Sequence, residues 1–140
     1  MDELHGAGKV PLSFWVVAEL GVLWNGFAVM VYWLTATRNA AAMAHSPPEM
    51  VDALNHTPMW ALGAWGLAVG AALAGSVLLM LRRRWAVSAF VVSLGGLLVL
   101  TIYQVAVNMP MSILQIITIW LVALFLLRFS SSEAGKGLLR

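Results

Sequence analysis

Four long apolar segments alternate with short polar segments along the chain. Each apolar segment approaches or exceeds the roughly 20 residues that an α-helix needs to cross a bilayer. The pattern therefore predicts an all-α integral membrane protein whose four transmembrane helices form an antiparallel bundle. The expected spans are residues 11–35, 58–81, 85–107 and 112–129.

The polar segments between the spans differ in length. Residues 36–57 form the longest one, an expected outer loop in which Ser46-Pro47-Pro48-Glu49 has the residues of a helix start. Spans two and three are joined only by Arg82-Arg83-Arg84, so we expect them to form a tight hairpin. Residues 130–140 are polar and are expected to form a mobile tail. Because the spans leave no room for a second domain, residues 1–140 are expected to form a single membrane domain.

Basic residues are distributed unequally between alternate polar segments. Of the eight Lys and Arg residues, only Arg38 lies in the segments on one side of the expected membrane. Because basic residues concentrate in cytoplasmic loops, this bias predicts that both termini are cytoplasmic. We expect these residues to meet anionic lipid headgroups rather than nucleic acid. The other seven are Lys9, Arg82, Arg83, Arg84, Arg128, Lys136 and Arg140.

Composition narrows the range of functions. The chain is 61% hydrophobic and 10% charged, whereas soluble domains carry about 25% charged residues. The absence of cysteine excludes disulfides and thiolate chemistry. No catalytic motif is present, so we expect no enzymatic activity and no cofactor. Methionine and histidine residues near the outer loops are donors that suit copper(I), but they lack a closely spaced repeat, and we expect no metal site. These residues are Met43, His45, Met50, His56, Met59, Met109 and Met111.

Small residues recur along spans two and three at intervals that place them on one face of a helix. Such residues allow two helices to approach closely in lipid. We therefore expect the closest helix contact between spans two and three. The alternative is that the small face of span two joins protomers. The expected packing residues are Gly63, Gly66, Gly70 and Ala74 in span two, and Ala89, Ser93 and Gly96 in span three.

Glu19 is the one acidic residue well inside a span. A charge near the centre of a membrane helix costs about 2.5 kcal/mol or more, so we expect Glu19 to point into the bundle or into a protein interface. Arg128, near the cytoplasmic end of span four, is its expected ionic partner. The carboxyl group would then be a structural partner of Arg128, a group kept neutral by apolar surroundings, or a site coupled to proton or cation movement.

Amide and aromatic side chains gather in the outer half of the expected bundle. They predict a small pocket, open to the outside, for a neutral polyhydroxy or amphiphilic ligand, because amides hydrogen-bond and rings stack without a charge. The alternative is that these groups only form hydrogen bonds between helices. The candidate ligand-binding residues are Asn25, Tyr32, Trp65, Tyr103, Gln104 and Gln115.

Several short stretches between about residue 20 and residue 105 together resemble a family of small, uncharacterised four-helix bacterial inner-membrane proteins, sometimes labelled sugar-transporter-like. The resemblance implies a four-helix membrane fold and a location in the bacterial inner membrane. The chain departs from the family pattern at residues 51–56 and at Glu19. The matching stretches are Leu23-Trp24-Asn25-Gly26-Phe27, Tyr32 with Thr35, Thr37-Arg38-Asn39, Pro48-Glu49-Met50, Pro58 with Trp60, Ala64-Trp65, Ala74-Gly75-Ser76, Leu81-Arg82-Arg83-Arg84-Trp85-Ala86-Val87 and Thr101-Ile102-Tyr103-Gln104.

Two functions are compatible with these features. The first is a non-catalytic accessory, scaffold or assembly subunit that associates with itself or with a larger membrane complex through helix packing. The second is a small homo-oligomeric carrier or binding protein for a neutral polar or amphiphilic solute. Short loops and an apolar fourth span favour the first function, and the polar outer half favours the second.

Overall fold

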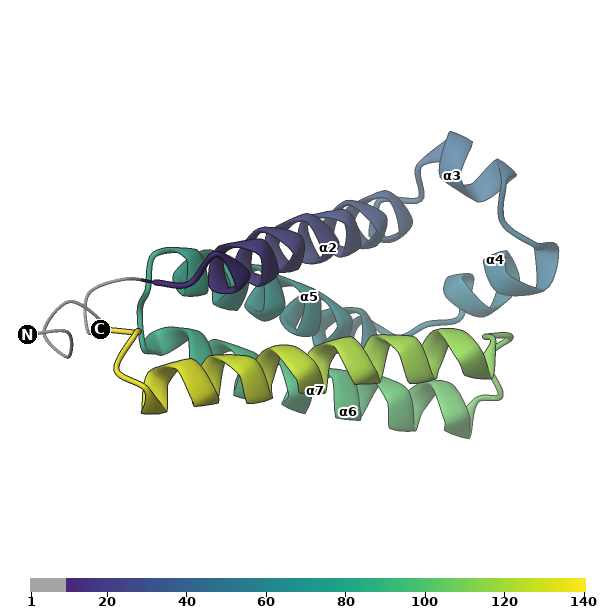
Figure 1. Ribbon diagram of the computed structural model, residues 1–140. Helices are drawn as coiled ribbons and strands as arrows, with labels where there is room; N and C mark the ends of the chain where they lie inside the picture. The colour runs from purple at the N-terminus through teal and green to yellow at the C-terminus, as the bar shows by residue number, and fades with distance from the viewer. Residues whose placement is uncertain (1–9) are drawn as a thin grey trace, which may run out of the picture.

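The computed structural model describes residues 10–140, and this part of the chain is helical with no strand (Figure 1). Four of its helices have the length and apolar character to cross a membrane. The predicted all-α fold with four spans is therefore confirmed, and the chain is a multi-pass membrane protein. The long helices are α2 (Leu12–Ala36), α5 (Met59–Met80), α6 (Trp85–Ala106) and α7 (Ile113–Gly135), and the short ones are α3 (Ala40–Ala44) and α4 (Pro48–Asn55).

The long helices pack in chain order. Helix α2 packs on α5, α5 on α6, and α6 on α7, with α5 and α6 in the most extensive contact. The last point confirms the predicted hairpin. Helices α2 and α7 diverge toward the end of the molecule that carries α3 and α4, here called the loop end (Figure 1). The C-terminus and the start of α2 lie at the opposite end, here called the terminal end.

The contact between α5 and α6 is close because α6 presents small residues to the backbone of α5. A Cβ atom at Gly96 would lie 2.9 Å from the carbonyl oxygen of Ala64 and 3.0 Å from the backbone nitrogen of Ala68. The Ser93 hydroxyl donates a 2.6 Å hydrogen bond to the carbonyl oxygen of Ala68. The predicted packing role of Ser93 and Gly96 is therefore confirmed.

The predicted packing face of α5, apart from Gly66, meets no other helix within residues 10–140 of the single chain, and the alternative that it joins protomers stays a prediction. Gly63, Gly70 and Ala74 are exposed, and a Cβ atom at Gly63 or Gly70 would meet no neighbouring atom within 4 Å. The buried positions are instead Ala61, Ala68 and Gly75, which recur at seven-residue intervals, together with Ser76 and Leu79. Gly63 and Gly70 follow Ala61 and Ala68 by two residues, which places them about 200° further round the helix.

Gly66 does lie at a helix contact, although its partner is α2 rather than α6. A Cβ atom at Gly66 would lie 2.7 Å from the Tyr32 hydroxyl oxygen and 2.9 Å from the neighbouring ring carbon. The absence of a side chain at this position therefore allows the Tyr32 ring to lie against α5.

The segment after the fourth span is ordered and docked, so the prediction of a mobile tail is wrong. Helix α7 continues to Gly135, and Gly137 (φ 79°) turns the chain back. The Arg84 N–H donates to the Arg140 carbonyl (2.9 Å), and the Arg140 N–H donates to the Arg82 carbonyl (2.6 Å). Backbone pairing thus attaches the tail to the turn between α5 and α6.

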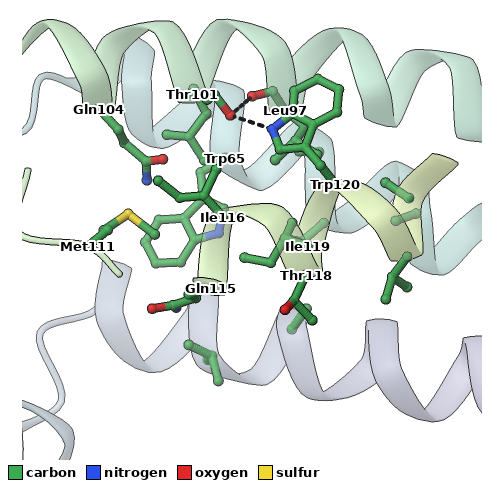
Figure 2. Close-up of a pocket in the computed structure, with 18 of the residues that line it drawn as sticks. Trp65, Leu97, Thr101, Gln104, Met111, Gln115, Ile116, Thr118, Ile119 and Trp120 are labelled. Atoms are coloured by element: carbon green, nitrogen blue, oxygen red, sulfur yellow. Dashed lines mark hydrogen bonds between the residues drawn. The ribbon is translucent and has the colours of Figure 1, made fainter. Parts of the chain in front are cut away.

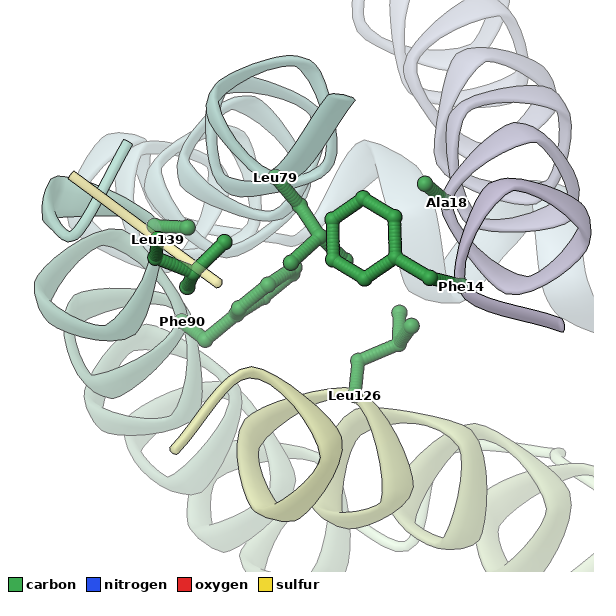
Figure 3. Packing of buried hydrophobic residues seen from close by; sticks show 7 residues of the cluster. Phe14, Ala18, Leu79, Phe90, Leu126 and Leu139 are labelled. Atoms are coloured by element: carbon green, nitrogen blue, oxygen red, sulfur yellow. The ribbon is translucent and has the colours of Figure 1, made fainter. Parts of the chain in front are cut away.

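The tail completes the core at the terminal end. Leu139 is 1% exposed and joins a cluster contributed by all four long helices. Figure 3 shows Leu139 beside Phe90, with Leu79 and then Phe14 further from Leu139. The cluster consists of Phe14, Ala18, Leu79, Ala86, Phe90, Leu126 and Leu139.

The fold predicts that the loop and terminal ends lie on opposite sides of the membrane. Asn55, at the end of α4, and Ser131, near the end of α7, are both exposed. Since the chain lacks cysteine, single cysteines at these positions would each report one side. Asn55→Cys and Ser131→Cys should react with a membrane-impermeant thiol reagent from opposite sides. Labelling from the same side would contradict the four-span topology.

Candidate functional site

A cavity of about 740 Å³ lies between the helices in the loop-end half of the molecule (Figure 2). Its walls come from all four long helices and from the α3–α4 connection. The cavity exists because α7 packs mainly on α6 while α2 packs on α5, so the two outer helices separate. Its volume lies in the range of about 300 to 1,000 Å³ that is common for small-molecule sites.

The structure places most of the candidate ligand-binding residues around this cavity. Tyr32 is the exception, because its ring packs edge-on against Trp65 at 5.2 Å between ring centroids. Tyr32 thereby packs against Trp65, which lines the cavity, without lining the cavity itself. The lining residues among the six candidates are Asn25, Trp65, Tyr103, Gln104 and Gln115.

Asn25 connects α2 to α5 at the deep side of the cavity. Its side-chain nitrogen donates a buried 2.8 Å hydrogen bond to the Ser76 hydroxyl oxygen. The Ser76 hydroxyl donates in turn to the carbonyl oxygen of Ala72 at 3.0 Å. The amide nitrogen of Asn25 thus has the interhelical role that was the alternative to ligand binding. Its side-chain oxygen accepts no hydrogen bond from residues 10–140, and Asn25 is one of the residues that line the cavity.

Gln104 and Gln115 face the cavity at its loop end. Their carboxamide groups lie on either side of the Trp65 indole in Figure 2. None of these three side chains makes a hydrogen bond within the described part of the chain. Gln104 and Trp65 are half-buried, and Gln115 is exposed. The cavity therefore offers free donors and acceptors to a bound molecule or to water.

Trp120 and Thr101 connect the wall formed by α7 to α6. The Trp120 indole N–H donates to the Thr101 hydroxyl oxygen at 3.1 Å, and that hydroxyl donates to the Leu97 carbonyl at 2.7 Å (Figure 2). Both residues line the cavity. Trp120 was not among the predicted site residues, although its position two turns inside the fourth span distinguishes it from an interfacial anchor.

The α3–α4 connection covers the loop end of the cavity. Met50 and Leu54 of α4 line it, together with Ser46. The Arg38 guanidinium group donates a hydrogen bond to the Leu54 carbonyl oxygen and so links the end of α2 to α4. A second nitrogen of that group, Nη1, is buried and has no partner among residues 10–140.

The lining is electrically neutral. No Asp, Glu, Lys, Arg or His is among the residues that line the cavity. Within residues 10–140, no three His, Cys, Asp or Glu residues lie close enough to hold a metal ion. The polar character of the cavity therefore comes from amide, hydroxyl and indole groups.

Glu19 and Arg128 are both exposed, and they do not form an ion pair with each other. The prediction that Glu19 points into the bundle is therefore not met within a single chain. Ala18 takes the buried position, and Glu19 is rotated from it by about 100°. The alternative, that Glu19 lies in an interface with another protein, stays a prediction.

The buried carboxylate of the described chain is Glu133, which lies in the segment predicted to form a mobile tail. Glu133 is 4% exposed, and its Oε1 atom accepts a 3.1 Å hydrogen bond from the Lys136 ammonium group. Its Oε2 atom is buried without a partner among the described residues. The extension of α7 beyond residue 129 is what places this side chain inside the terminal end.

Comparison with known protein families, curated proteins and solved structures finds no match. The resemblance to the small four-helix family therefore stays a prediction. Fold and site together define a class: a multi-pass membrane protein with four candidate spans and a neutral cavity lined by all four of them.

Proposed function

We propose that this protein is a small, non-catalytic membrane carrier or binding protein for a neutral amphiphilic molecule. The observation that supports this proposal best is the cavity between α2 and α7, which combines a ligand-sized volume with unpaired amide groups and no charged side chain. A location in the bacterial inner membrane with cytoplasmic termini belongs to the same proposal. The basic residues at the terminal end support it.

The chemistry of the lining favours a neutral polar group on the ligand. A charged headgroup enclosed here would lack an opposite charge, and burial of an unpaired charge is strongly unfavourable. Hydroxyl groups, by contrast, both donate and accept, and so match the carboxamides of Gln104 and Gln115. The indole of Trp65 adds a flat surface against which a polyol or sugar ring packs.

Removal of the Gln104 carboxamide should weaken ligand binding while the fold survives. In Gln104→Leu, loss of one or two hydrogen bonds worth about 0.5–1.5 kcal/mol each should raise the dissociation constant roughly tenfold. Monooleoylglycerol, which joins a neutral diol headgroup to one acyl chain, is a suitable probe. Binding can be measured by native mass spectrometry of the purified protein.

Asn55→Leu is the matched control, because it removes an exposed amide at the same end of the molecule but outside the cavity. It should leave the affinity for monooleoylglycerol unchanged. Equal affinities of the wild type and Gln104→Leu, in proteins with the same thermal stability, would contradict the proposed site. A lysophospholipid with an anionic headgroup should bind more weakly, and tighter binding of that probe would contradict the preference for neutral ligands.

A role as an accessory or assembly subunit is the second candidate. It is supported by the exposed small face of α5, where Gly63 and Gly70 have open space in front of them, and by α7, the least buried span. Small residues of this kind let another helix approach closely. Stoichiometric co-purification of a second membrane protein in mild detergent, lost in Gly70→Leu, would favour this function over ligand binding.

A further inference from the structure

A second hollow, a groove of about 600 Å³, runs between α2 and α7 toward the terminal end. Every residue that lines it is apolar or glycine. Leu20, Leu23, Phe27 and Phe125 in its walls are exposed at the molecular surface. The full lining is Val17, Leu20, Gly21, Leu23, Trp24, Phe27, Val122, Phe125 and Leu126.

The groove and the polar cavity adjoin each other. Trp24 and Phe27 from α2, and Val122 and Leu126 from α7, line both of them. The combined space is polar at the loop end, where Gln104 and Gln115 lie, and wholly apolar further along. Gln115 and Phe125 are separated by about 15 Å along α7, which is the length of an acyl chain of moderate size rather than of a small solute.

We infer that the groove holds the hydrocarbon chain of the ligand, and that the ligand enters sideways from the bilayer between α2 and α7. This inference rests on the proposed function and names its ligand class: a lipid with at least one acyl chain and a neutral, hydroxyl-bearing headgroup. The headgroup lies among Gln104, Trp65 and Gln115. The chain points toward the terminal end.

The helix contacts favour this route of entry. The loop end is covered by α4, which Arg38 holds through the Leu54 carbonyl. Between α2 and α7, by contrast, no hydrogen bond or ion pair is formed in the described chain. The two helices meet near the terminal end, where Phe14 and Phe129 lie 6.0 Å apart between ring centroids. Separation of α2 from α7 therefore breaks no polar contact.

The end of the groove is closed by the core of the terminal end. Leu126 belongs both to the groove and to the cluster with Phe14 and Ala18. A Cβ atom at Gly21 would lie 3.4 Å from a methyl carbon of Leu126 and 3.2 Å from the Ser76 hydroxyl oxygen. This packing limits how far a chain can extend, so the site should select chains by length.

Photolabelling in phosphatidylcholine nanodiscs tests the inference. One monoacylglycerol probe carries a diazirine near the end of its chain, and a second carries the diazirine on the glycerol. The chain probe should label residues 17–27 and 122–126, and the headgroup probe should label peptides that contain Gln104 or Gln115. Excess monooleoylglycerol should suppress both signals at least fivefold, because it displaces the probe from the site. Labelling by probe dissolved in the surrounding bilayer would not be suppressed.

Val122→Phe adds volume where cavity and groove join and should reduce groove labelling by the chain probe at least fivefold. Val99→Phe is the matched control, since Val99 is exposed on α6 and lines neither hollow. If Val122→Phe does not fold, the labelling of the wild-type protein decides. Competed labelling by the headgroup probe without groove labelling by the chain probe would overturn the inference and leave the proposed function standing. The absence of competed labelling by both probes would overturn both.

Discussion

Gly96→Leu should prevent α5 and α6 from packing and thereby abolish the stable four-helix fold. The side chain would meet the backbone of α5 at Ala64 and Ala68, and backbone atoms have no rotamer through which to move away. Overpacking of a well-packed core usually costs 1–3 kcal/mol, and a clash with a helix backbone should reach about 3 kcal/mol or more. We expect little folded monomer in detergent, as judged by size-exclusion chromatography and thermal unfolding.

Gly70→Leu is the matched control for this prediction. It introduces the same side chain into the same membrane bundle, but on a face of α5 that meets no neighbour within 4 Å. Its unfolding temperature should lie close to that of the wild type. A comparable loss of folded protein in the two variants would mean that both faces of α5 are occupied in the assembled protein. A wild-type unfolding temperature for Gly96→Leu would refute the α5–α6 contact itself.

Leu139→Ala should release the C-terminal segment from the terminal end. Truncation of a fully buried leucine costs about 2–5 kcal/mol, depending on how far the cavity collapses. Leu139 is the only fully buried side chain of the segment after Gly137. The lost free energy of packing should therefore exceed the stabilisation that the hydrogen bonds with residues 82–84 still provide. Hydrogen exchange at the backbone amides of Arg84 and Arg140 should accelerate by at least tenfold.

Leu138→Ala provides the comparison, since Leu138 is less buried than Leu139 and contributes its carbonyl oxygen rather than its side chain to the pairing with Arg82. Its exchange rates should change little. Unchanged protection of both amides in Leu139→Ala would show that the backbone hydrogen bonds alone hold the segment. In that case the core cluster would have to be stable without Leu139.

The spans could be predicted because the length of an uninterrupted apolar segment is decided by the bilayer, which the sequence reflects directly. The spans 58–81 and 85–107 correspond closely to Met59–Met80 and Trp85–Ala106. The approach of Gln104 and Gln115 could also be anticipated, because both lie at the same membrane level. The shape of the cavity between them could not, since it depends on the divergence of α2 from α7.

The packing face of α5 could not be predicted for a related reason. In a soluble helix the buried face is the apolar one, but every face of a membrane helix is apolar. Helix α5 carries glycine or alanine on several faces, and only the position of α6 decides which of them is used. The predicted face through Gly66, Gly70 and Ala74 therefore differs from the buried one through Ala61 and Ala68.

The docked tail could not be predicted because every hydrogen bond that holds it uses a backbone group of residues 138–140, and such groups are present in any sequence. Two backbone hydrogen bonds join Arg84 and Arg140, and Arg140 and Arg82, and the Arg82 and Arg84 side chains donate to the backbone carbonyls of Leu138 and Leu139. The pair Leu138-Leu139 is the available apolar signal in a segment that is otherwise mostly polar. For Glu19 the sequence signal was present but misleading. A charge inside a span predicts a position within the bundle, whereas Glu19 is exposed in the single chain.

The gap between α2 and α7 changes what a ligand must compete with. The acyl chain of a lipid that enters there moves from the hydrocarbon of the bilayer to an equally apolar groove. Burial of the chain therefore supplies almost no driving force of its own. Discrimination among lipids then rests on the headgroup contacts and on the fit of chain length. Occupancy is set by the mole fraction of the lipid in the membrane, with the abundant bilayer lipids as competitors, and not by its aqueous concentration. A dissociation constant for this protein therefore has meaning only together with the composition of the surrounding bilayer.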